Sequence, residues 1–82
     1  MNYYVYLIVS IIKKKTISYV GYTNNLKKRI KHHNTNKGAK FTKGKKWKLV
    51  YYEVYDSRIE AMKEEYSLKK NYYLRNKLKR LK

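Results

Sequence analysis

The acidic residues of this chain are confined to one short segment, and this confinement points to chemistry. Lys and Arg number 22 against five Asp and Glu, which gives a net charge of +17. Residues 1–52 contain no carboxylate, and all five lie between Glu53 and Glu65. So basic a surface attracts polyanions, nucleic acid above all. An acid facing bound phosphates weakens binding unless a cation lies between them, and a helix start explains Glu64 or Glu65 poorly.

Four other side chains could act together with such an acid. Tyr6 and Tyr19 lie in two neighbouring apolar segments, and Arg29 and His33 are four residues apart, which is one face of a helix. Gly21 follows Tyr19 by two residues and would let the backbone pass close to a ligand or turn sharply. With Glu65, the set comprises two phenols, a guanidinium, an imidazole and a carboxylate.

The elements that must position these groups can be read from the apolar pattern. The first half of the chain predicts an antiparallel hairpin, with strands over 3–9 and 16–22 and a loop over 10–15, and then a helix over 26–34 capped by residues 23–25. The second half predicts a Gly- and Lys-rich connector over 35–48, a strand over 49–55, a helix starting at a Ser57–Glu60 capping box, and a short terminal helix marked by Leu74, Leu78 and Leu81.

These elements predict an α+β fold, with a small three-stranded, mostly antiparallel sheet flanked by helices in the order β-β-α-β-α-α. The length of 82 residues predicts a single domain over 1–82. The absence of Cys excludes disulfides and thiolate chemistry, and two His leave little for a metal cage. The uncharged run around Val5–Ile12 is too short to span a bilayer, so we expect a cytoplasmic protein without a membrane partner.

The order of the motifs resembles the GIY-YIG nuclease family, in particular its small stand-alone bacterial proteins. The resemblance rests on Tyr4-Val5-Tyr6, on Tyr19-Val20-Gly21, and on Arg29, His33 and Glu65 in that order. The connector 37–44 and the segment 60–70 are also similar to that subgroup. Two departures exist. Only the final Tyr6 of the first motif is kept, and the spacing from Tyr6 to Tyr19 is slightly long, which we assign to a longer hairpin loop around Lys13–Lys15.

The resemblance implies a role for each group. Glu65 would hold one divalent cation, Mg²⁺ or Mn²⁺, with Glu64 as the alternative ligand; a simple surface pair between Glu65 and Lys69 is the competing interpretation. Arg29 would hold the scissile phosphate, for which its planar fork suits better than Lys. His33 could accept the proton of the attacking water or hold the phosphate, although packing is the commoner role of such a histidine.

The two tyrosines and the connector complete the implied site. One of Tyr6 and Tyr19 would polarise the water and the other would hold it or the phosphate, while Gly21 would serve only the backbone. Phe41 or Trp47 could stack on an exposed base, although Trp47 more simply anchors the connector to the core. Phosphates would be bound by basic residues of the helix and connector: Lys28, Lys37, Lys40, Lys43, Lys45, Lys46 and Lys48.

The leading hypothesis is therefore a metal-dependent DNA endonuclease that selects DNA structure rather than sequence and acts in repair, recombination or mobile-element processing. High charge supplies affinity without reading bases, so targeting would depend on DNA shape or on a protein partner. The alternative is a non-catalytic basic protein that binds DNA or RNA and keeps the fold. A ribosome-associated RNA-binding protein would be indifferent to Glu65.

Overall fold

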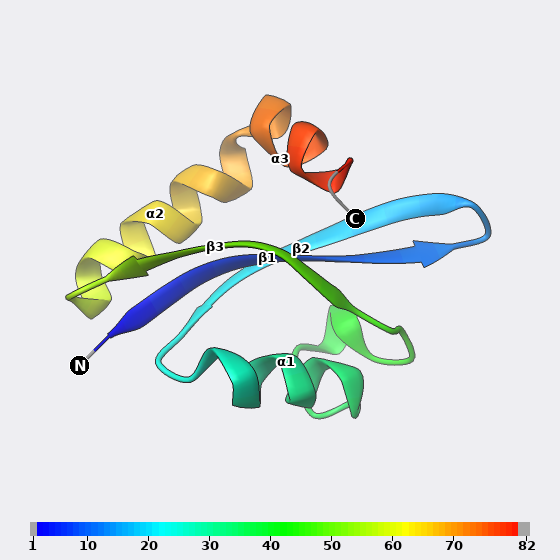
Figure 1. Cartoon of the computed structure of the whole chain (residues 1–82), viewed down its shortest axis with the longest axis horizontal. Coiled ribbons are helices and arrows are strands. Elements are labelled where there is room, and N and C mark those ends of the chain that lie inside the picture. Colours follow the sequence, from blue (N-terminus) through cyan, green and yellow to red (C-terminus); the bar gives the residue numbers. More distant parts are fainter. Residues whose placement is uncertain (1, 81–82) are drawn as a thin grey trace.

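A computed structural model describes residues 2–80 of the chain, and Figure 1 shows their arrangement. The fold is α+β, as predicted, with the elements in the order β-β-α-β-α-α and one short 3₁₀ helix in the connector. The elements are β1 (Tyr3–Ile12), β2 (Lys15–Thr23), α1 (Leu26–Asn34), η1 (Lys40–Thr42), β3 (Lys48–Tyr55), α2 (Arg58–Lys70) and α3 (Tyr72–Lys79).

The three strands form one antiparallel sheet in the order β2-β1-β3, so β1 is central and the other two strands are edges. The β-branched and aromatic residues of β1 suit a strand that is covered on both faces. Within the β1–β2 ladder, Tyr6 lies opposite Gly21 and Ile8 lies opposite Tyr19. Because side chains alternate between faces, Tyr6, Tyr19 and position 21 share one face of the sheet.

The predicted loop over 10–15 was wrong. β1 continues to Ile12 and pairs with Lys15, so only Lys13 and Lys14 form the turn. Both have positive φ, 51° and 68°, as a tight hairpin turn requires. The longer spacing between Tyr6 and Tyr19 therefore lengthens the two strands rather than the loop. The sequence hides this because Asn and Gly, the residues that normally mark such a turn, are replaced by two lysines.

The predicted helix caps are confirmed. The Asn25 side chain accepts from the backbone N–H of Lys28 at 3.1 Å at the start of α1, and Ser57 accepts from Glu60 at 3.1 Å at the start of α2. Both bonds satisfy backbone donors that a helix start leaves free. The terminal helix begins at Tyr72, two residues earlier than its leucine pattern indicates, and buries Leu78; Leu81 lies outside the described residues.

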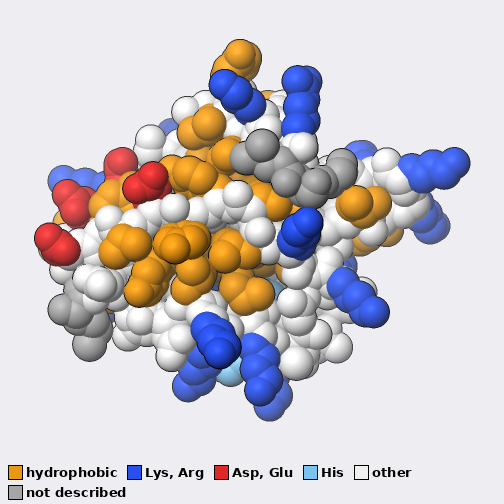
Figure 2. Space-filling view, in the orientation of Figure 1, with side chains coloured by type: hydrophobic (Ala, Val, Ile, Leu, Met, Phe, Trp, Pro, Cys, Tyr) orange, Lys and Arg blue, Asp and Glu red, His pale blue; other side chains and the backbone are white. Residues whose placement is uncertain are grey.

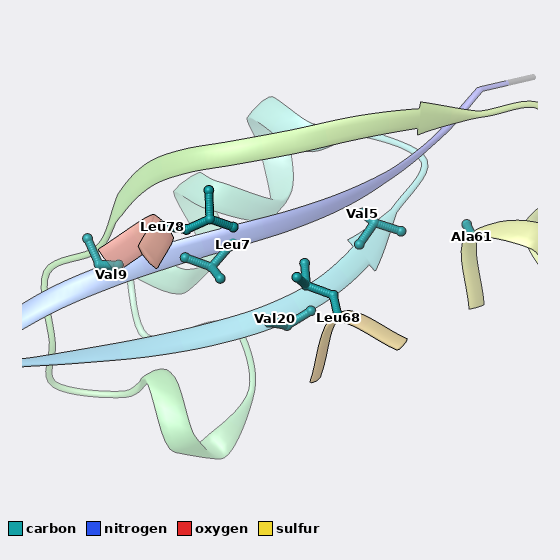
Figure 3. Close-up of a cluster of buried hydrophobic side chains, with 7 residues drawn as sticks. All are labelled: Val5, Leu7, Val9, Val20, Ala61, Leu68 and Leu78. Atoms are coloured by element: carbon teal, nitrogen blue, oxygen red, sulfur yellow. The ribbon is translucent and has the colours of Figure 1, made fainter. Parts of the chain in front are cut away.

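Helices cover both faces of the sheet: α2 and α3 lie on one side, and α1 with the connector lies on the other (Figure 1). The first side holds the larger core cluster, whose members Figure 3 draws as Val5, Leu7, Val9, Val20, Ala61, Leu68 and Leu78. The second side buries Tyr6, Ile8 and Trp47 against Tyr19 and the apolar residues of α1. Tyr6 and Tyr19 therefore belong to the core of the α1 side.

The sheet covers only one of the two sides of α2 that carry apolar residues. Ala61 and Leu68 are buried, whereas Ile59 and Tyr66 remain 69% and 59% exposed. Glu65 follows Ala61 by four residues and precedes Leu68 by three, so it shares the buried side of α2, and its side chain is 20% exposed.

Candidate active site

The Tyr6 side chain occupies space that is free only because residue 21 is a glycine. A Cβ built on Gly21 would collide with the Tyr6 hydroxyl and would lie 2.7 Å from its Cζ. The Tyr6 side chain is buried, with 1% of its surface exposed, and therefore has no free space into which to retreat. Gly21 is thus required by the close approach of a side chain from the neighbouring strand rather than by a turn.

The Tyr6 hydroxyl begins a chain of hydrogen bonds through His33 to the connector. Tyr6 Oη lies 2.7 Å from His33 Nε2, and His33 Nδ1 lies 2.9 Å from Thr42 Oγ1. The Thr42 hydroxyl in turn donates to the carbonyl of Ala39 at 2.8 Å. His33 and Thr42 are both fully buried, so these bonds are shielded from water.

This chain assigns the tautomer of His33. Thr42 has one hydroxyl proton and uses it on Ala39, so Nδ1 of His33 must donate to Thr42. Burial, together with the charges of Arg29 and His32, lowers the pKa of His33 to about 4, which leaves the ring neutral near pH 7. Nε2 is then a bare acceptor, and it receives the hydroxyl proton of Tyr6.

Arg29 links the two tyrosines. Hydrogen bonding to Tyr6 raises the pKa of Arg29, and the charge and hydrogen bond of Tyr19 add to this effect. Burial raises the pKa of Tyr6 to about 12, although the hydrogen bond and charge of Arg29 oppose it. Tyr19 also packs edge-on against His33, with ring centroids 5.2 Å apart. The structure therefore brings Tyr6, Tyr19, Arg29 and His33 into one contiguous cluster.

Glu65 approaches this cluster from α2, the helix on the other side of the sheet. Its negative charge is among the causes that raise the pKa of Tyr6, so the carboxylate lies within electrostatic reach of that hydroxyl. Glu64 points to β3 instead, where burial raises the pKa of Tyr55 and the Glu64 charge adds to the effect. Of the two alternatives, Glu65 is thus the acid whose charge acts on Tyr6, although burial is the main cause that raises the pKa of Tyr6.

The pair between Glu65 and Lys69 also forms, but it is loose. Lys69 Nζ lies 3.7 Å from Glu65 Oε1, with the Lys69 side chain 50% exposed and that of Glu65 20% exposed. Such a pair at i and i+4 contributes only about 0.3–0.5 kcal/mol, so it does not prevent Glu65 from binding a ligand.

The resemblance implies a metal ion, and the side chains present suit only an ion that keeps most of its bound water. Within residues 2–80, no group of three or more His, Asp or Glu could hold an ion. A single half-buried carboxylate suits a hard ion that keeps most of its water, such as Mg²⁺ or Mn²⁺, with phosphate oxygens completing the shell. The same donor set does not suit Zn²⁺, which takes three or four protein ligands.

Sequence reasoning missed two residues of the connector that hold His33 in place. Thr42 fixes the ring through Nδ1, and a Cβ on Gly38 would collide with that same nitrogen and lie 3.0 Å from Cε1. Both residues stand in the segment that matched the family connector, yet a Thr and a Gly in a Lys-rich loop carry no signal of their own. Only the folded connector shows that they enclose the imidazole.

Trp47 anchors the connector, as the simpler interpretation expected. Its side chain is 6% exposed and donates from Nε1 to the carbonyl of Thr42 at 3.0 Å, while Asn34 bonds both backbone groups of Trp47. Phe41 differs, because it is 51% exposed and stacks on Tyr19 with centroids 6.2 Å apart. Of the two rings, Phe41 is therefore the one that a nucleobase could reach.

The basic residues expected to bind phosphates are mostly free to do so. Those exposed on α1, the connector and the start of β3 are Lys28, Lys37, Lys40, Lys43, Lys46 and Lys48. Lys45 differs, since its ammonium donates to the carbonyl of Phe41 at 2.9 Å and lies 5.2 Å from the centre of the Phe41 ring. Phosphate binding by Lys45 would require these contacts to be exchanged.

Comparison with known proteins identifies the family of this chain. The family model for the GIY-YIG catalytic domain matches residues 2–79. The chain therefore belongs to the GIY-YIG family, whose members are generally endonucleases and typically require a divalent metal. This membership implies a nucleic-acid substrate. No helix within residues 2–80 is long and apolar enough to cross a membrane.

Among its relatives are small bacterial proteins named UPF0213. The chain is 50% identical over 72 residues to a UPF0213 protein of Clostridium perfringens, which covers 85% of this chain and 72% of the relative. It is 44% identical over 69 residues to one from Staphylococcus haemolyticus, covering 83% and 80%. The chain is also similar to UPF0213 protein BH0048 from Bacillus halodurans, which has a solution structure. The two sequences are 41% identical, the match covers 84% of this chain and 71% of that protein, and the TM-score is 0.45.

Proposed function

We propose that this protein is a divalent-metal-dependent endonuclease that hydrolyses DNA phosphodiester bonds and selects its substrate by structure, in repair, recombination or mobile-element processing. The observation that carries the proposal is the buried chain of hydrogen bonds Tyr6–His33–Thr42. In the tautomer of His33 that these bonds require, the unprotonated Nε2 accepts from the phenol hydroxyl of Tyr6. Such an arrangement can move a proton. In a scaffold that only binds nucleic acid, the same bonds would serve to hold the connector on the core.

In the resting site, Tyr6 is a poor base. Burial raises the pKa of Tyr6 to about 12 and lowers the pKa of His33 to about 4, so transfer of the phenol proton to the imidazole is strongly unfavourable. The site therefore has to be switched on by substrate. A phosphate bound to Arg29 would neutralise a charge that lowers the pKa of His33, and so would favour protonation of His33. The same phosphate weakens the effect of Arg29 that lowers the pKa of Tyr6, so the phenol must gain one proton as it gives up the other.

The residues then have separate tasks. Arg29 binds the scissile phosphate and offsets the charge that develops as water attacks phosphorus. Tyr6 takes the proton of that water while its own proton passes to Nε2 of His33, and Tyr19 holds the water or the phosphate. Glu65 would hold the divalent cation, which when bound acts as a Lewis acid on the phosphate and on water.

Affinity would come from the exposed lysines. Lysines of α1 and the connector neutralise phosphates without reading bases, which favours selection by DNA shape or by a targeting protein. All five acidic residues follow these lysines in the sequence, and Figure 2 shows acidic side chains gathered at one end of the face that it draws. The proposed DNA path follows the basic side.

Cleavage and binding measured on one branched duplex test this proposal. Wild type with Mg²⁺ or Mn²⁺ should cut the duplex, and EDTA should stop cutting. Glu65→Gln should abolish cutting and leave binding unchanged or tighter, because one negative charge has been removed. Glu64→Gln is the matched control and should cut normally.

Other results would reject the proposal. Tight binding without cutting under any metal would favour the non-catalytic protein. Tighter binding to an RNA hairpin than to DNA, with no effect of Glu65→Gln, would favour the RNA-binding protein. Normal cutting by Glu65→Gln would remove the metal assignment.

A further inference from the structure

An open groove of about 750 Å³ lies between α1 and the strands β1 and β3. Its lining includes Tyr4 and Tyr52 from the sheet and Leu26, Ile30, Lys27 and Lys31 from α1. None of the five candidate catalytic residues lines it. The groove is therefore a separate feature of the same face of the sheet.

The floor of the groove is aromatic and open. Tyr4 and Tyr52 pack edge to face with ring centroids 6.1 Å apart, and Tyr52 remains 50% exposed. Figure 2 shows a band of hydrophobic side chains on this side of the molecule, with basic side chains along its lower border. Exposed aromatic rings of this kind offer faces on which nucleobases stack.

Helical geometry explains why the rim of the groove is basic. Lys27 and Lys31 are four residues apart and share one face of α1, as Arg29 and His33 share another. Two residues along a helix correspond to a rotation of about 200°, so these two faces point in nearly opposite directions. One helix therefore presents Arg29 to the active site and two lysines to the groove. Among residues 2–80, no carboxylate lines the groove.

We propose that this groove binds an unpaired segment of the DNA substrate, with bases against Tyr52 and Tyr4 and phosphates on Lys27 and Lys31. The inference rests on the proposed function for the identity of the nucleic acid. Since α1 is only about 10 Å across, a strand that leaves the active site reaches the groove within a few nucleotides. The groove would thus favour substrates with a single-stranded stretch next to the cut.

Charge argues against a second copy of this chain as the occupant. Each copy carries a net charge of +17, and the rim of the groove is basic, so two copies would repel each other there. A polyanion with flat apolar bases complements both the aromatic floor and the basic rim.

Binding by fluorescence anisotropy in EDTA tests the proposal without cleavage. The probes are a labelled thymidine strand of about 12 nucleotides, an abasic strand of equal length, and a blunt duplex. Tyr52→Ala should weaken binding of the thymidine strand about tenfold and leave the abasic strand and the duplex nearly unchanged. Tyr73→Ala is the matched control, because Tyr73 is 81% exposed on α3 and lies outside the groove.

A second pair of variants keeps the test independent of Tyr52. Lys27→Gln with Lys31→Gln should weaken binding of both single strands more than Lys77→Gln with Lys79→Gln, which removes the same charge from α3. Circular dichroism melting checks that all variants fold.

Three results would overturn the proposal that this groove binds an unpaired strand. Tyr52→Ala could bind like Tyr73→Ala, or it could lose the duplex and the abasic strand as strongly as the thymidine strand. Wild type could also sediment as a dimer that Tyr52→Ala dissociates, which would make the groove a self-interface. Failure of wild type to cut DNA rejects the nuclease alone, since the binding differences in EDTA remain measurable.

Discussion

Replacement of Gly21 by Ala tests the central geometry of the site. The added Cβ would collide with the Tyr6 hydroxyl and would lie 2.7 Å from Cζ, where carbon atoms normally stay about 3.5 Å apart. The Tyr6 ring must therefore move by roughly 0.8 Å, and its hydrogen bond to His33 Nε2 at 2.7 Å is broken or stretched. We expect a loss of about 1–3 kcal/mol in the free energy of unfolding, as for other overpacked cores.

The expected effect on cleavage is larger than the loss of stability. A displacement of about 1 Å in a catalytic group lowers the rate about 100-fold. The assay is nicking of supercoiled plasmid under single-turnover conditions, at a temperature where urea unfolding shows the variant to be folded. Phosphate binding by the exposed lysines does not involve position 21, so affinity for duplex DNA should stay within about twofold of wild type.

Gly44→Ala is the matched control. Gly44 has φ of +75° and no atom within 4 Å of an added Cβ, so Ala there strains the backbone but touches no part of the site. It should lose about 1 kcal/mol of stability and keep its cleavage rate. The reasoning is refuted if Gly21→Ala cuts at the wild-type rate, or if Gly44→Ala loses as much activity as Gly21→Ala.

Three further perturbations follow from the same contacts. Thr42→Val leaves His33 Nδ1 without its acceptor, so we expect urea unfolding to show a loss of about 1–3 kcal/mol and plasmid nicking to slow. Because the pKa of buried His33 is about 4 in the folded chain against 6.5 ordinarily, stability is full above pH 6.5 and falls by about 3 kcal/mol as pH drops toward 4. His32→Gln should keep most of this slope, because the charge of His32 is the smallest cause of the low pKa of His33, and disappearance of the slope in this variant would contradict the assignment. Lys43→Ala should weaken duplex binding for every sequence and reduce the salt slope by about 1, measured by anisotropy against Lys77→Ala; a change that depends on sequence would disagree.

Much of this fold could be predicted from local patterns. The caps at Asn25 and Ser57 and the continuous apolar run of β1 are local features of the sequence, so they could be read directly. The hairpin turn could not, because Lys13 and Lys14 adopt positive φ only under the pairing of the flanking strands. Long-range pairing overrides the local preference of these two residues.

The candidate site shows the same division. Residue type and order single out five candidates in the sequence: Tyr6, Tyr19, Arg29, His33 and Glu65. In the structure the first four contact one another, and the charge of Glu65 acts on Tyr6 from a greater distance.

The supporting residues were invisible in the sequence because their roles depend on tertiary contacts. Thr42 matters through one hydrogen bond to His33, and Gly38 matters because it leaves room for that ring. Similarly, the exposure of Ile59 and Tyr66 depends on which side of α2 meets the sheet, and spacing along the helix does not determine this.

Nicking of supercoiled plasmid in Mg²⁺ by wild type, Glu65→Gln and Glu64→Gln, purified identically, tests the central claim most directly. The account predicts nicking by wild type and Glu64→Gln that EDTA abolishes, and none by Glu65→Gln. Equal nicking by all three proteins would contradict the claim that Glu65 completes a metal-dependent active site with Tyr6, Arg29 and His33.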